Sequence, residues 1–196
     1  MGIGAGQIIQ QFNAGELDLN IPNMITLGRL LAVPVMVWLI LNDFIFAAFW
    51  LFVAAGISDA IDGFLAKRWN QVTEFGAYLD PLADKALLAS VFITLGVQGH
   101  LESWLVILVV FRDVMIVGAV VLFQTMVRSL EMDPLFISKV NTLAQIILAA
   151  LVLGAEGYNV DMGLFMEMMT GIVAVTTMAS GLSYLVVIMR RLSSQV

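Results

Sequence analysis

The sequence predicts an all-α integral membrane protein, a bundle of six transmembrane helices. Of its 196 residues 61% are hydrophobic and 12% are charged, and so few polar groups could not cover the surface of a soluble domain of this size. Six apolar runs each approach the roughly 20 residues needed to cross a bilayer. The absence of cysteine excludes a disulfide framework and a thiolate metal site.

The first 22 residues are predicted to form a separate N-terminal segment. Ile8, Ile9 and Phe12 recur at helical spacing, which favours a short helix on the membrane surface, with a loosely ordered tail as the alternative. The segment lacks the basic start of a signal peptide. Pro22 then opens the first apolar run, as proline can at a helix start. We therefore expect an interfacial segment over 1–22 and one transmembrane domain over 23–196.

Short polar breaks separate the six predicted spans, so neighbouring helices should be joined by short connections. The spans are expected at about 23–41, 44–67, 75–97, 101–126, 135–154 and 163–189. An even number of spans places both termini on one side of the membrane. The basic residues near span ends fall on that side: Lys67, Arg68, Arg128, Lys139, Arg190 and Arg191. The opposite loops carry acids and no Lys or Arg, so both termini should face the cytoplasm of a bacterial-type inner membrane.

Four aspartates, Asp59, Asp62, Asp80 and Asp84, interrupt the second and third apolar runs. Each costs on the order of 2.5–3.5 kcal/mol in a membrane-spanning segment. The pairs are three and four residues apart, which puts each pair on one helix face. Counted from Gln71 in the loop, Asp62 and Asp80 are each nine residues away, and Asp59 and Asp84 are twelve and thirteen away. If the two helices are antiparallel neighbours, the four carboxylates converge near the cytoplasmic edge.

Carboxylates brought this close repel one another unless they bind protons or cations. Oxygen ligands without His or Cys favour hard ions, Mg²⁺ or Mn²⁺, and two metals held by carboxylates are suited to displacement at phosphorus. Gly63, Ala66 and Gly76 keep the helices thin, and Pro81 disrupts the helix ladder, so a bulky ligand could approach.

The alternative is structural. The four acids could be solvated at the membrane surface, or they could pair with Lys85, Arg68 and Arg112. A single aspartate would favour this alternative, whereas four at matched depth among small residues favour a metal site.

The stretch resembles the signature of the CDP-alcohol phosphotransferases, D-x2-D-G-x2-A-R-x8-G-x3-D-x3-D. The four aspartates, Gly63, Ala66 and Gly76 keep every spacing, and Lys67 replaces the family arginine, which loses a bidentate fork. Arg68 follows directly and could take that role. The resemblance implies a metal-dependent enzyme with six spans and a cytoplasmic site.

The resemblance also implies residue roles. The four aspartates would hold two divalent cations at the pyrophosphate of CDP-diacylglycerol, and Asp84 would be the general base for an acceptor hydroxyl. The donor would bind at Asn23, Thr26, Arg29, Asp62, Gly63, Ala66, Lys67 and Gly76. A homodimer is also implied by the family, and no nucleic-acid partner is expected.

Two branches of the family differ in their acceptor. The sequences FRDVMIVGA and PLFISKVNTLAQ resemble the CMP-forming cardiolipin synthases, which transfer the phosphatidyl group to phosphatidylglycerol. The glycerophosphate branch should carry a K-x-K pair where this chain has Lys139 and Asn141. A phosphodiester anchored by its tails needs fewer cations than glycerol 3-phosphate. We therefore expect phosphatidylglycerol as acceptor, bound by Arg112 and Lys139, with a phosphatidylglycerophosphate synthase as the alternative.

Two further points follow from the residues alone. Arg112 and Asp113 are adjacent, so on a helix they point about 100° apart and are not expected to pair with each other. An ion-coupled transporter is the rival from another class, because acids inside membranes often mark ion pathways. Such sites usually lie near the midplane, whereas these acids cluster toward one surface.

Overall fold

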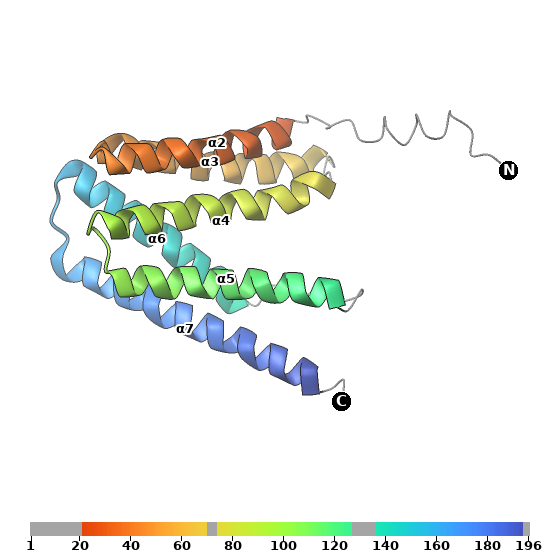
Figure 1. The fold of residues 1–196 in the computed structure, drawn as a ribbon. Coiled ribbons are helices and arrows are strands. Elements are labelled where there is room, and N and C mark those ends of the chain that lie inside the picture. The colour runs from red at the N-terminus through yellow and green to blue at the C-terminus, as the bar shows by residue number, and fades with distance from the viewer. Residues whose placement is uncertain (1–20, 70–73, 127–135, 194–196) are drawn as a thin grey trace, which may run out of the picture.

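The computed structural model of the protein describes residues 21–69, 74–126 and 136–193, and over these ranges it is all-helical (Figure 1). The helices are α2 (Ile21–Leu41), α3 (Ile45–Trp69), α4 (Glu74–Val97), α5 (Ser103–Met126), α6 (Phe136–Tyr158) and α7 (Gly163–Ser193). A helix is found within a few residues of the bounds of each predicted span. Nearly all of the predicted interfacial segment lies outside the described residues.

The turns at one end of the bundle fall at the predicted polar breaks. Asp43, Gly99 and Asn159 adopt positive φ angles of 61°, 80° and 53°, as tight reversals between helices require. Figure 1 shows the α2–α3, α4–α5 and α6–α7 connections together at this end, and the start of α2 and the end of α7 at the other. This arrangement agrees with an even number of antiparallel helices.

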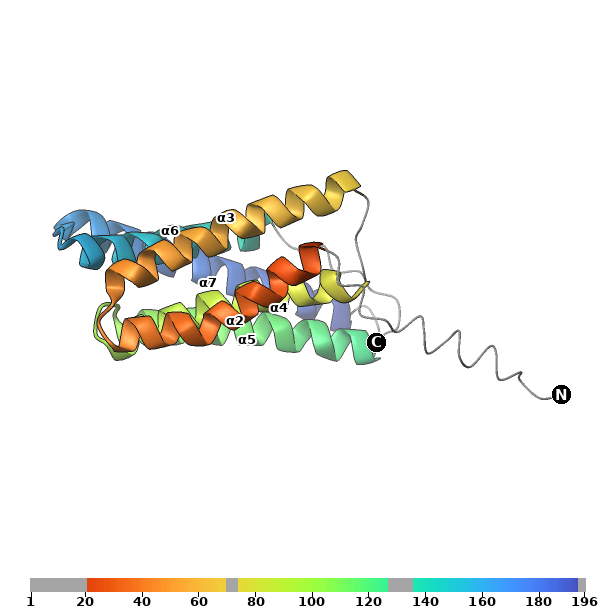
Figure 2. The ribbon, with the colours of Figure 1, turned by 90° about the horizontal axis from the view of Figure 1, so that it is seen from above.

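The packing between helices corrects one expectation. Within the described ranges α3 and α4 do not pack against each other, although they were expected to be neighbours. Instead α2 packs against both, and α6 also contacts both. Figure 2 shows α3 diverging from α2 and α4 toward the end that carries the aspartates. The remaining contacts join α5 to α4 and to α7, and α6 to α7.

The core of the bundle is apolar, and so is much of its outside. Met36, Ile40 and Phe92 are fully buried, whereas Ile107 and Val175 are 68% and 67% exposed. Exposed apolar side chains on this scale are typical of a lipid-facing surface. Among the described residues, α6 and the Gly163–Val187 part of α7 are long and apolar enough to cross a membrane. Six transmembrane spans therefore stay a prediction.

Candidate functional site

The four aspartates are divided between two helices. Asp59 lies on α3 and Asp84 on α4, and their side chains are 47% and 46% exposed. Asp62 and Asp80 also lie on these helices, but their side chains are outside the described ones. The structure therefore places two of the four carboxylates.

Arg29 of α2 joins these two carboxylates. Its Nη1 atom lies 2.7 Å from Oδ1 of Asp59 and also contacts Oδ1 of Asp84. The Arg29 side chain is almost fully buried, because α2 packs between α3 and α4. The predicted convergence of Asp59 and Asp84 is thus confirmed, but an arginine from a third helix brings them together.

A cavity of about 110 Å³ adjoins this ion-paired group. Phe52, Ala55 and Gly56 of α3 form one wall, and Thr142 and Ile146 of α6 form another. The remaining lining comes from Arg29, Asp59, Asp84, Lys85, Leu87 and Leu88. The space exists because α3 and α4 do not touch here, so the small residues on α3 leave the carboxylates accessible.

The chemistry of the described donors fits a hard cation. Asp59 and Asp84 present half-exposed carboxylate oxygens from opposing helices to one positively charged group. Among the side chains that the structure describes, which do not include those of Asp62 and Asp80, no group of three or more His, Cys, Asp or Glu could hold a metal. The two described carboxylates can supply part of an oxygen site.

The other predicted donor-site residues are only partly described. Thr26 is buried one turn before Arg29 on α2. The side chains of Asn23, Ala66 and Lys67, and the surroundings of Gly63 and Gly76, lie outside what the structure describes, so their roles stay predictions.

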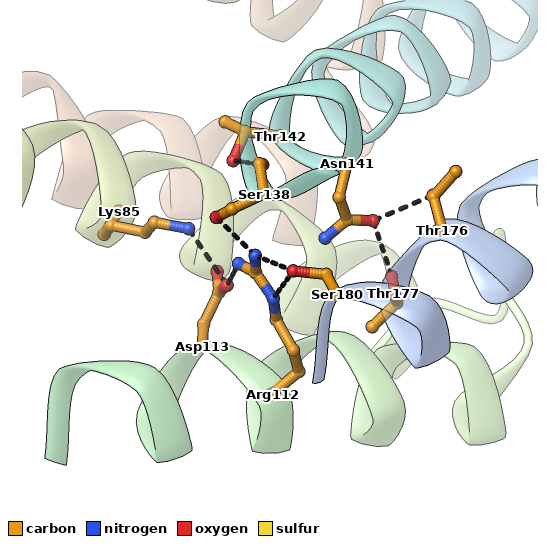
Figure 3. Close-up of polar contacts among 9 residues, drawn as sticks. All are labelled: Lys85, Arg112, Asp113, Ser138, Asn141, Thr142, Thr176, Thr177 and Ser180. Atoms are coloured by element: carbon orange, nitrogen blue, oxygen red, sulfur yellow. Dashed lines mark hydrogen bonds and ion pairs between the residues drawn. The ribbon is translucent and has the colours of Figure 1, made fainter. Parts of the chain in front are cut away.

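A second polar cluster joins α4, α5, α6 and α7 (Figure 3). The Nη1 of Arg112 lies 2.6 Å from Oδ1 of Asp113, so the expectation that these adjacent residues would not pair is wrong. The long arginine side chain can curl back along its own helix, which overcomes the difference in direction between the two Cα–Cβ bonds. Lys85 Nζ donates to the same Asp113 oxygen at 2.9 Å.

The rest of the Arg112 guanidinium binds hydroxyl groups of the C-terminal helices. Nη2 donates to Oγ of Ser138 at 2.6 Å, and Nε donates to Oγ of Ser180 at 3.2 Å. Arg112 is 3% exposed and lines none of the cavity at Arg29. Lys139 is exposed at the start of α6 and does not line that cavity either. The acceptor role of both residues stays a prediction.

These contacts test the alternative that the four aspartates pair with Lys85, Arg68 and Arg112. Among the described residues Asp59 and Asp84 pair with Arg29, whereas Lys85 and Arg112 pair with Asp113. Arg68 lies outside the described side chains. The sequence assigned Arg29 to the donor but did not indicate its ion pairs. A cation inside an apolar run needs an anionic partner, and that requirement was the available signal.

Asn141 is a further buried polar residue of α6. Its Oδ1 accepts hydrogen bonds of 2.9 Å from the hydroxyl groups of both Thr176 and Thr177 on α7 (Figure 3). The residue is fully buried, and these two hydrogen bonds to its amide oxygen link α6 to α7. The sequence singled out position 141 as a marker of the acceptor, but it did not predict these partners.

Comparisons with known proteins show the family of the chain. The family model "CDP-alcohol phosphatidyltransferase" matches residues 19–189. The chloroplastic CDP-diacylglycerol–glycerol-3-phosphate 3-phosphatidyltransferase 1 of Oryza sativa subsp. japonica is 36% identical over 86% of this chain and 57% of its own length. The cardiolipin synthase (CMP-forming) of Rattus norvegicus is 35% identical over 84% of this chain and 60% of its own length.

A bacterial relative matches over almost its full length. The CDP-diacylglycerol–glycerol-3-phosphate 3-phosphatidyltransferase of Escherichia coli is 35% identical over 86% of this chain and 94% of its own length. By contrast, the chain spans somewhat less than two thirds of the rice and rat proteins. The chain belongs to the CDP-alcohol phosphatidyltransferase family, which favours an enzyme over a transporter. Both acceptor branches are represented at nearly equal identity, so the comparisons leave the acceptor open.

Proposed function

We propose that this protein transfers a phosphatidyl group from CDP-diacylglycerol to the hydroxyl of phosphatidylglycerol, which yields cardiolipin and CMP. The observation that carries the reaction type is the meeting of Asp59 and Asp84, both half-exposed, at a cavity between α3 and α4. In a member of this family, these are the first and last aspartates of the signature.

The proposed chemistry is a displacement at phosphorus. Asp84 accepts the proton of the acceptor hydroxyl, and the acceptor oxygen bonds to the lipid-side phosphorus of the donor. The bond from that phosphorus to the bridging oxygen breaks, and CMP leaves with the bonding electrons. Arg29 holds positive charge beside Asp59 and Asp84, which limits the repulsion between the two carboxylates and the donor's phosphates.

Asp59, Asp62, Asp80 and Asp84 would hold two divalent cations, Mg²⁺ or Mn²⁺, and bound metal would supply neutralisation of the pyrophosphate charge. The accessible carboxylate oxygens of Asp59 and Asp84 support this assignment. Asn23, Thr26, Gly63, Ala66, Lys67 and Gly76 complete the proposed donor site.

The choice of phosphatidylglycerol rests on the environment of position 141. The glycerophosphate branch is expected to carry a second lysine there, whereas this chain has a neutral amide that is fully buried against Thr176 and Thr177. Position 141 therefore supplies no cation for a doubly charged acceptor. Phosphatidylglycerol carries one charge and is also held by its tails, so it needs less positive charge from the protein.

The same proposal includes six spans in a bacterial-type inner membrane, with the site and both termini in the cytoplasm, and a homodimer. The exposed apolar side chains of all six helices and the asymmetry of Lys and Arg support the membrane arrangement. The dimer rests on the family resemblance.

The acceptor assignment is tested by direct competition. Purified protein in detergent receives CDP-diacylglycerol with phosphatidylglycerol or with glycerol 3-phosphate, and release of CMP is measured. We expect turnover mainly with phosphatidylglycerol, with cardiolipin as the lipid product. Exclusive use of glycerol 3-phosphate would overturn the acceptor assignment and would leave the family unchanged.

A further inference from the structure

A groove between α4 and α5 lies next to the candidate site. Its volume is about 410 Å³, several times that of the cavity at Arg29. Ala86 and Ala89 of α4 and Gly118 of α5 leave the space open, and Val114 and Val117 form an exposed apolar rim. A groove of this kind can hold an acyl chain without exposing polar backbone to lipid.

Lys85 connects the groove with the cavity, because it lines both. Its ammonium group binds Asp113 at 2.9 Å, and its side chain is 33% exposed (Figure 3). In contacts between described residues Lys85 uses one of its three N–H donors. The remaining donors are available to an oxygen-bearing ligand at the point where the groove meets the cavity.

On the side of α5, the charges of the cluster that contains Lys85 favour an anion, whereas Asp59 and Asp84 on the side of the cavity are paired with Arg29. Lys85 and Arg112 carry two positive charges, and Asp113, which contacts both, carries one negative charge. Arg112 is buried and held by Ser138 and Ser180, so the surplus positive charge is accessible at Lys85. One surplus charge matches a phosphodiester, which carries one negative charge.

We propose that the α4–α5 groove binds an acyl chain of an anionic phospholipid whose phosphodiester contacts Lys85. This inference rests on the proposed function: the lipid is the acceptor phosphatidylglycerol, and Lys85 holds its phosphate. In-line displacement requires the attacking and leaving oxygens on opposite sides of phosphorus. The proposed nucleotide residues lie mainly on α2 and α3, so an acceptor at the α4–α5 groove would approach from a different side of the bundle. Asp113 is a positioning residue that directs Lys85 toward the junction.

Fluorescence quenching tests the groove without relying on turnover. The chain has no cysteine, so a single label can be placed at Val114→Cys on the rim of the groove or at Val175→Cys on α7. The two valines are 65% and 67% exposed, which makes them matched positions. In phosphatidylcholine nanodiscs, phosphatidylglycerol with a nitroxide on one acyl chain should quench the label at position 114 more strongly than the label at position 175. Equal quenching, or equal preference for nitroxide-labelled phosphatidylcholine, would overturn the proposal.

Substitutions then test the apolar groove and the Lys85 ammonium group separately. Gly118→Leu fills it, and a Cβ at Gly118 meets no atom within 4 Å, so the helix should accept the change. Gly171→Leu on α7 is the matched control, since Gly171 is also open and lines no described cavity. Gly118→Leu should abolish the excess quenching at position 114, and Lys85→Gln should abolish the preference for phosphatidylglycerol. Lys85→Arg should retain that preference.

Kinetics distinguish this inference from the proposed function. Gly118→Leu should raise KM for phosphatidylglycerol but not for its deacylated form, glycerophosphoglycerol. Lys85→Gln should raise KM for both about tenfold or more, with a smaller change in kcat. A rise in KM for CDP-diacylglycerol alone would assign the groove to the donor and overturn the proposal. If the wild-type protein uses only glycerol 3-phosphate, the acceptor assignment fails, whereas quenching still decides whether the groove binds an anionic lipid.

Discussion

The charged cluster at Arg29 and the charged cluster at Arg112 differ in how accessible they are. The side chains of Asp59 and Asp84 are almost half exposed beside a cavity, whereas Arg112 is 3% exposed and bonded on every nitrogen. Both clusters contain an arginine that contacts residues of more than one helix. The difference indicates that the first cluster presents its charges to a ligand, while the buried Arg112 of the second mainly joins helices. Experiments on the two clusters should therefore change different quantities.

Removal of divalent cations should have the largest effect on activity, and it tests only the cluster that contains Asp59 and Asp84. EDTA is expected to stop CMP release, because the divalent cations that the four aspartates would hold supply the positive charge that neutralises the pyrophosphate. Mg²⁺ or Mn²⁺ added in excess should restore the rate. Full activity in EDTA would contradict the two-metal proposal, and a helical circular dichroism signal that is unchanged would exclude unfolding as the cause of lost activity.

Asp84→Asn should reduce kcat by about 10²–10⁴, the usual contribution of a general base. The side chain is half exposed, so the fold should be largely retained. CMP release with saturating substrates measures the loss. Asp43→Asn in the α2–α3 turn makes the same chemical change at the opposite end of the bundle, and it should leave the rate unaltered. A near-normal rate for Asp84→Asn would remove Asp84 from the base role.

Arg112→Met should mainly lower stability, by about 3–5 kcal/mol, because breaking a buried ion pair leaves polar partners without compensation. The cost falls toward the lower end of this range, since Lys85 still neutralises Asp113. Urea or thermal unfolding in detergent measures the change. If Arg112 instead binds the acceptor as predicted from the sequence, unfolding would be unaffected and KM for the acceptor would rise.

His100→Gln should have the smallest effect, at most about 1 kcal/mol, as is usual for partly exposed ion pairs. His100 Nδ1 lies 3.3 Å from Oε1 of Glu156, across the turns at the end remote from the aspartates. Unfolding should barely shift, and CMP release should be unchanged. A large loss of activity would mean that the two ends of the bundle are coupled, and the contrast between the clusters would then be incomplete.

The sequence predicts the helices well because apolar run length and turn residues are local properties. The end of α6 is an exception, since it was expected near residue 154 and lies at Tyr158. The ring of Tyr158 packs against Phe46 and Phe49 of α3, with centroid distances of 5.2 and 5.9 Å. Asn159 then ends the helix with a positive φ angle. This tertiary packing extends the helix through Glu156 and Gly157, which the sequence predicts as a break.

The site is predictable from the sequence only in part, for a similar reason. Spacing and depth correctly bring Asp59 and Asp84 together, because helix geometry is regular along the chain. The Arg29 bridge and the Arg112–Asp113 pair depend on which helix lies between which others and on side-chain conformation. Neither can be read from spacing. The separation of α3 and α4 cannot be read from spacing either, since it depends on the position of α2.

The position of α2 has a consequence for recognising members of this family in incomplete sequences. The signature over residues 59–84 is continuous in the chain, yet its first and last carboxylates are bridged by Arg29, thirty residues before the first of them. A truncated homologue that began at α3 would still match the signature in full. It would nevertheless lack the residue that joins the two halves, so a motif match alone overstates what such a fragment can do.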